Sequence, residues 1–231
     1  EIADALKAAV HGCSLGAGGT ELILLKADLL ERSWRREDAM EALESALESD
    51  PANATIRSNL SQTHLFQGRR EEAWNVLEGT PNWSEPVLHI QKGRLLLADY
   101  DANRDAGHAD GAILAEAESA FRGALEVDRE NGLAWLCVGR CQRLADDLAE
   151  ASISLNRAKR LMDDPLVCAE ESLIALDEGR VEDAARLIDE ADVKERTSLV
   201  IPYVKGLVAA RRGNLAEAFE RFNEVLMANP H

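Results

Sequence analysis

Residues 135–158 read WLCVGRCQRLADDLAEASISLNRA, and the spacing within this stretch decides the fold. The small residue Gly139 is followed twelve positions later by Ala151, and the large apolar Leu155 comes four positions after that. Small side chains at two such points let two antiparallel helices approach closely, while the large residue fills the space beside them. The stretch therefore predicts a unit of two packed helices joined by a turn.

The same spacing recurs along the chain. Four further copies place a small residue, an alanine twelve positions on and a large apolar residue four positions later: Ala27, Ala39 and Leu43; Ser61, Ala73 and Leu77; Ser172, Ala184 and Ile188; Gly206, Ala218 and Phe222. Another copy has Gly93 before Ala117 and Phe121, with twelve extra residues between its first two members. In three copies a glycine lies where the first helix must end, because glycine adopts positive φ at little cost; these are Gly68, Gly179 and Gly213.

This pattern resembles the tetratricopeptide repeat, a helix–turn–helix unit of about 34 residues. The resemblance covers about residues 20–231. It divides them into six repeats, at 20–53, 54–85, 86–131, 132–164, 165–198 and 199–231. The resemblance implies an all-α, right-handed solenoid of stacked helix pairs. The third repeat carries an insertion at about residues 100–111, which we expect to be a mobile loop because it lacks apolar periodicity.

The two ends of the chain do not fit whole repeats. Residues 1–19 look like the end of a preceding repeat followed by a glycine-rich loop, built on Gly12, Gly16, Gly18 and Gly19. The last repeat stops at Pro230 and His231 without a polar covering helix, which terminal repeats normally need. We therefore expect the chain to be part of a longer array or of a multidomain protein.

Composition excludes several classes of function. Acidic residues number 42 and basic residues 26, giving a net charge of −16. Such a chain is a poor ligand for nucleic-acid phosphates, which bind Lys and Arg, and anionic lipids repel it. No stretch approaches the roughly 18 apolar residues of a membrane-spanning helix. The four cysteines form no disulfide-scaffold pattern, which favours a soluble cytoplasmic protein without fixing the compartment.

No catalytic set is visible in the sequence. The histidines lack HExxH spacing, and there is no GxSxG motif, phosphate loop or dinucleotide fingerprint. His64 and His89 fall within predicted helices and are expected to be structural. Paired carboxylates in predicted turns are expected to cap helices, because Asp hydrogen-bonds locally there; they are Asp146, Asp147, Asp163 and Asp164. The sequence therefore predicts a protein that is not an enzyme and needs no cofactor.

Two candidate metal sites each have a simpler interpretation. Cys137 and Cys141 share a helix face, and Cys168 could lie near them as a zinc ligand, but a fourth ligand is missing. Buried cysteines acting as small apolar residues are the preferred interpretation. The acidic stretch 99–111 partly resembles a calcium loop, yet Arg104 stands where such a loop needs glycine. A solvated loop is preferred there, and calcium is the alternative.

The first helices of the repeats are expected to line a concave surface. We predict that a partner binds on a mostly apolar groove interrupted by arginines, made of Leu65, Phe66, Ile90, Arg94, Leu97, Leu136, Arg140, Arg143, Leu173 and Tyr203. Arginine can pair with a carboxylate at two points while its stem covers apolar surface. The predicted function is a non-catalytic protein–protein interaction scaffold for a peptide, helix or protein bearing acidic and apolar residues. The alternative is a regulatory or positioning domain of a larger polypeptide with a catalytic or export domain. The sequence leaves the oligomeric state open.

Overall fold

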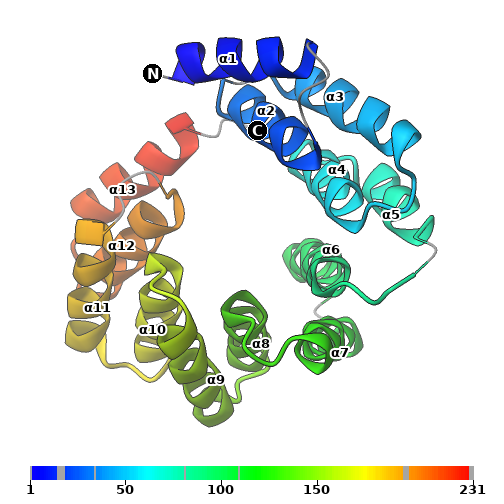
Figure 1. Cartoon of the computed structure of the whole chain (residues 1–231). Helices are drawn as coiled ribbons and strands as arrows, with labels where there is room; N and C mark the ends of the chain where they lie inside the picture. Colours follow the sequence, from blue (N-terminus) through cyan, green and yellow to red (C-terminus); the bar gives the residue numbers. More distant parts are fainter. Residues whose placement is uncertain are drawn as a thin grey trace. The chain divides into compact units, whose positions relative to one another are not determined.

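A computed structural model describes residues 2–14, 19–33, 35–80, 82–108, 110–194 and 198–228. These residues form thirteen α-helices and contain no strand, so the predicted all-α fold of helix pairs is confirmed (Figure 1). Part of the predicted glycine-rich loop, Gly16 and Gly18, lies outside the described residues, as do Pro230 and His231. The chain divides into two compact units, residues 1–129 and 130–231.

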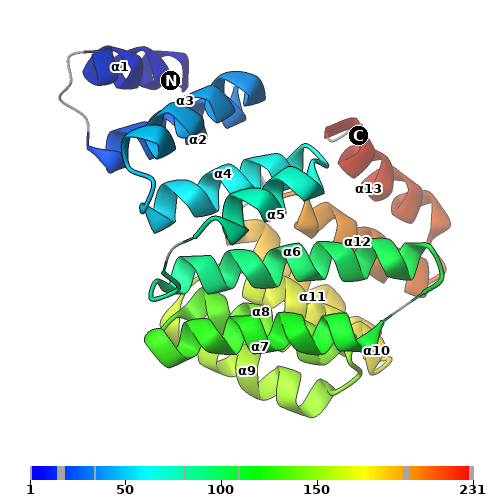
Figure 2. The same ribbon diagram turned by 90° about the vertical axis from the view of Figure 1, so that its right-hand side faces the viewer.

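The first unit contains one single helix and three helix pairs. The helices are α1 (Ile2–Ser14), α2 (Thr20–Arg32), α3 (Arg36–Ser49), α4 (Ala54–Phe66), α5 (Arg70–Glu78), α6 (Pro86–Asp105) and α7 (Gly111–Val127). Within a pair the helices pack on each other, and the second helix also packs on the first helix of the next pair, as α3 does on α4 and α5 on α6. Figure 2 shows α5, α6 and α7 side by side in this order.

The second unit repeats this arrangement. Its helices are α8 (Gly132–Leu144), α9 (Leu148–Leu161), α10 (Pro165–Asp177), α11 (Val181–Lys194), α12 (Val200–Arg211) and α13 (Leu215–Ala228). The first helices also contact each other, α8 with α10 and α10 with α12. Each unit is therefore a stack of helix pairs, in which the first helices of the pairs form one row and the second helices form the other. Dividing the chain into repeats at the boundaries drawn from the sequence remains our proposal.

The turns within the pairs have the expected chemistry. Gly68, Gly179 and Gly213 adopt φ of +74°, +76° and +77°. In the α8–α9 turn the same conformation falls on Asp146, with φ of +65°, because a short polar side chain tolerates the left-handed region better than most. The neighbouring Asp147 then caps α9 by accepting a hydrogen bond from the backbone N–H of Glu150. Its predicted role as a cap is confirmed.

Small residues lie where the paired helices cross. A Cβ atom added to Gly93 would come within 2.5 Å of the Phe121 ring, and one added to Gly206 within 2.5 Å of the Phe222 ring. Gly139 has the same relation to Leu155, at 2.9 Å. The large residue four positions after the alanine therefore fills the space that the missing side chain leaves. The recurring spacing in the sequence is explained by this contact.

The prediction of a loop at residues 100–111 is wrong for most of this range. Helix α6 continues to Asp105, and only residues 106–110 connect it to α7. Tyr100 is buried, and Arg104 pairs with Asp101 one turn earlier at 3.1 Å. The extra residues therefore lengthen α6 and α7, because the insertion carries its own buried contact and its own ion pair along a helix.

This helix also removes the geometry that the calcium alternative needed. Side chains two positions apart on a helix point in different directions, so the acidic residues 99–105 cannot converge as they do in a loop. Asp99 instead accepts a hydrogen bond from Trp74 Nε1 at 3.1 Å. Among the described residues no group of three or more His, Cys, Asp or Glu side chains could hold a metal ion. Cys141 and Cys168 are buried and Cys137 is half-buried.

His64 is buried on α4, with 6% of its surface exposed. Its Nδ1 atom has no hydrogen-bond partner within the described residues. Burial lowers the pKa of this imidazole, against the opposing effect of Glu44, because the charged form loses its hydration. Below about pH 6.5 the unfolded chain therefore binds a proton at His64 more readily than the folded chain does.

We expect this difference to appear as acid sensitivity. Stability conferred by neutral His64 is present above its unfolded-state pKa and is lost as the pH falls from about 7 toward 5. His64→Gln should flatten the fall in unfolding free energy across this range, measured by urea denaturation at several pH values. His108→Gln, at an exposed site, is the control. Parallel pH profiles for His64→Gln and the unmodified chain would contradict the prediction.

Candidate binding surfaces

The predicted groove residues do not form one exposed surface. Ile90, Leu97 and Leu136 are buried in the core, so their side chains are not available to a partner, and this part of the prediction is corrected. The cause is that each of these first helices packs on a neighbouring first helix as well as on its own partner, as α6 does on α4 and α8 does on α10. Little of its circumference is then left for solvent.

Four other predicted residues are at least partly accessible. Leu65 and Leu173 are half-buried against the core clusters of their units. Phe66 is 61% exposed at the end of α4. Tyr203 is also exposed, and its ring lies 6.0 Å from that of Phe222 in a tilted arrangement. Phe66 is thus the most accessible apolar side chain of the predicted set.

Two of the three predicted arginine anchors already form ion pairs with carboxylates of the second unit. Arg143 Nε lies 3.0 Å from Glu170 Oε2, and its Nη1 lies 3.3 Å from Asp177 Oδ2. Arg140 Nε lies 3.9 Å from the other oxygen of Glu170. These contacts join α8 to α10. An acidic partner could reach either arginine only by competing with these carboxylates.

Arg94, in the first unit, has a different environment. Its guanidinium donates a hydrogen bond to the amide oxygen of Gln62 on α4, and no carboxylate in the described part of the chain pairs with it. Gln62 precedes Phe66 by one helical turn, so the two share a face of α4. We call Gln62, Phe66 and Arg94 the α4–α6 surface. It combines an exposed ring with a cation whose charge is not neutralised.

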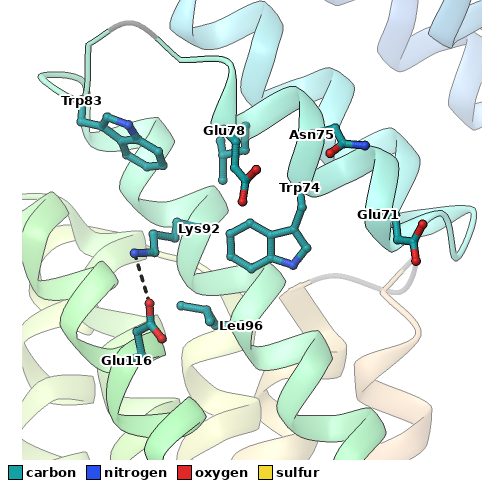
Figure 3. Close-up of a pocket in the computed structure, with 9 residues that line it drawn as sticks. Glu71, Trp74, Asn75, Glu78, Trp83, Lys92, Leu96 and Glu116 are labelled. Atoms are coloured by element: carbon teal, nitrogen blue, oxygen red, sulfur yellow. Dashed lines mark ion pairs between the residues drawn. The ribbon is translucent and has the colours of Figure 1, made fainter.

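A pocket that sequence reasoning missed lies between α5, α6 and α7 (Figure 3). The cavity measures about 700 Å³ and is lined by Glu71, Trp74, Asn75, Leu77, Glu78, Trp83, Lys92, Leu96 and Glu116. Figure 3 shows Trp83 and Trp74 on two sides of it, with Glu78 between them. We call it the tryptophan pocket. The signal in the sequence was that Trp74 and Trp83, two of only four tryptophans, lie within ten residues of each other.

Both indole rings of this pocket are held in place. Trp74 donates its Nε1 hydrogen bond to Asp99, which fixes the ring on α6. The backbone carbonyl of Trp83 lies 2.9 Å from His89 Nε2, and the two rings meet edge to face with centroids 5.6 Å apart. The rings are therefore positioned before any ligand arrives.

The pocket carries an excess of negative charge. Lys92 pairs with Glu116 at 3.3 Å, as the dashed line in Figure 3 marks. Glu71 and Glu78 are exposed and make no ion pair within the described residues. Three carboxylates thus face one ammonium group.

No helix in the described part of the chain is both long and apolar enough to cross a membrane. Residues 35–86 match the family model of the tetratricopeptide repeat. No curated protein matches the sequence.

Several solved structures share the fold at low sequence identity. A chain of the APC/C hetero-tetramer Cut9–Hcn1 has a TM-score of 0.69 and 18% identity over 90% of this chain, which spans only 38% of that one. A tetratricopeptide repeat protein from Parabacteroides merdae has a TM-score of 0.69 and 15% identity, covering 99% of this chain and 87% of its own. A thermophilic protein of the same kind from Thermus thermophilus has a TM-score of 0.62 and 20% identity, covering 91% and 98%.

At such identities the likeness of these structures shows the fold alone. The family match, in contrast, rests on the sequence of α3, α4 and α5 themselves. The sequence match to the tetratricopeptide repeat family thus covers residues 35–86, and the helix-pair fold of the described residues is the one seen in solved tetratricopeptide repeat proteins.

Proposed function

We propose that this chain is a non-catalytic scaffold that binds an acidic and apolar segment of a partner protein at the α4–α6 surface. Tetratricopeptide repeat proteins are in general scaffolds for protein–protein interaction, and they are generally not enzymes. The observation that carries the finer proposal is Arg94, a cation without a carboxylate partner among the described residues.

The neighbours of Arg94 support an amphipathic ligand. Phe66 offers an exposed ring on the same side as Gln62, which already orients the guanidinium. The planar fork of arginine pairs with a carboxylate at two points, and its stem covers apolar surface. A helix or extended segment with one acidic residue beside an apolar one would satisfy both groups.

Arg140 and Arg143 are not anchors of the proposed site. Both already face Glu170, so a partner carboxylate would gain little by replacing it. The alternative, that the scaffold positions a catalytic or export domain of a larger polypeptide, is tested by the sequence of the full gene.

The expected result is a loss of affinity when Arg94 is reversed. Peptides selected against the chain from a random library should carry acidic and apolar residues. Arg94→Glu should weaken the binding of such a peptide about tenfold, or about 1.4 kcal/mol, measured by fluorescence anisotropy. Phe66→Ala should weaken it by a similar factor because an exposed ring loses its contact.

Arg186→Glu provides the matched control, since Arg186 is an exposed arginine on α11 of the second unit. If the selected peptides bind Arg94→Glu and Phe66→Ala within a factor of three of the unmodified chain, the α4–α6 surface is not the binding site.

A further inference from the structure

We propose that the tryptophan pocket binds an arginine side chain of a basic protein segment, with the guanidinium group between Trp74 and Trp83 and paired with Glu78. This site is separate from the α4–α6 surface and takes a ligand of opposite charge. The inference therefore goes beyond the proposed function and can fail independently of it.

The aromatic walls favour a cation. A guanidinium over an indole face is attracted by the ring's negative face, by about 0.5–1 kcal/mol at an exposed site and more when water is excluded. The same chain already contains such a pair, because the guanidinium carbon of Arg157 lies 4.5 Å from the centre of the Trp135 ring. Trp74 and Trp83 are held by Asp99 and His89. They offer preformed walls, so little ordering cost remains on binding.

The charges of the pocket select the same ligand. Lys92 neutralises only Glu116, which leaves Glu71 and Glu78 to balance an incoming charge. Glu78 stands between the two tryptophans in Figure 3, where its carboxylate can accept hydrogen bonds from a group that stacks on either ring. The net charge of −16 adds a long-range attraction for basic segments. An anionic ligand would meet repulsion from three carboxylates.

The size of the pocket indicates a chain segment and not a small free cation. Its volume of about 700 Å³ exceeds what one side chain fills. A second cavity of about 470 Å³ adjoins it and shares Trp83, Lys92 and Glu116. This second cavity continues along α7 to Glu126, another carboxylate. A short extended segment can therefore place an arginine in the tryptophan pocket and its flanking residues in the second cavity.

Arginine suits the site better than lysine. Its planar group stacks on an indole and offers two parallel N–H donors to one carboxylate, while an ammonium is a compact and strongly hydrated charge. The neutral isostere citrulline keeps the shape and loses the charge. Comparing the binding of arginine, lysine and citrulline therefore separates the contributions of stacking, charge and hydrogen-bond geometry.

The test uses an acetylated and amidated pentapeptide, Gly-Ala-Arg-Ala-Gly, and its lysine and citrulline versions. Binding is followed by NMR from the four indole N–H signals, assigned with single Trp→Phe variants. We expect shifts for Trp74 and Trp83 but not for Trp135, at least tenfold weaker binding of the citrulline peptide, and about threefold weaker binding of the lysine peptide. Equal binding of the arginine and citrulline peptides, or shifts outside the tryptophan pocket, would overturn the proposal.

Variants and a second probe complete the test. Glu78→Gln and Trp83→Leu should each weaken the arginine peptide at least fivefold, while Glu220→Gln, at an exposed site on α13, should not. Unchanged helical circular dichroism shows that the variants fold. Free arginine should bind more weakly than the peptide; equal affinity would mean that a small molecule, and not a protein segment, occupies the site. Arg94→Glu should leave the arginine peptide unaffected, which separates this site from the α4–α6 surface.

Discussion

Replacing Phe121 with alanine is expected to lower the free energy of unfolding by about 3–5 kcal/mol, which is typical of truncating a fully buried phenylalanine. Phe121 has no exposed surface, and its ring occupies the space beside Gly93 where α7 crosses α6. Removing the ring leaves a cavity between two long helices that cannot close it without moving apart. Urea denaturation followed by circular dichroism measures the loss.

A companion change at Gly93 tests whether the contact is the cause. Gly93→Ala alone should destabilise the chain, because the added methyl group would lie 2.5 Å from two carbons of the Phe121 ring. In the Phe121→Ala background the same change should be neutral or stabilising by up to about 1 kcal/mol, since alanine favours a helix over glycine. Equal effects of Gly93→Ala in both backgrounds would show that the two positions do not meet.

This pair also shows what the sequence could predict. Gly93 and Phe121 can be matched across twelve extra residues because the contact needs only one small and one large residue on paired helices. The turn glycines were predictable for a similar reason, since positive φ is a local requirement. The conformation of the insertion was not, because it depends on the burial of Tyr100, a tertiary contact that outweighs an unfavourable local composition.

The candidate sites were less predictable than the fold. The register could place Arg94, Arg140 and Arg143 on first helices, but it could not tell which of them would meet a carboxylate on the neighbouring first helix. The tryptophan pocket combines α5, α6, α7 and the segment around Trp83. Its geometry follows from the short α5 and the long α6, and the length of α6 became clear only in the structure.

A second large effect is expected at Glu170, where α8 meets α10. Its side chain is 12% exposed, and that of Arg143 is 13% exposed. Glu170→Ala should lower the free energy of unfolding by about 2–3 kcal/mol, because it leaves a largely buried guanidinium without its main partner. The loss stays below that of a fully buried pair because Arg143 retains Asp177 at 3.3 Å. Asp177→Ala, whose carboxylate is more exposed, should cost less than about 1 kcal/mol and serves as the matched control.

The double variant decides whether Glu170 acts through charge. Arg143→Met in the Glu170→Ala background removes the unpaired guanidinium and keeps most of the apolar stem, so it should recover at least half of the lost stability. The same Arg143→Met change in the unmodified chain should destabilise it, because Glu170 then loses its closest cation. If Arg143→Met is equally costly in both backgrounds, Glu170 contributes by packing alone. The ion pair between Arg143 and Glu170 would then add little to the stability of this unit.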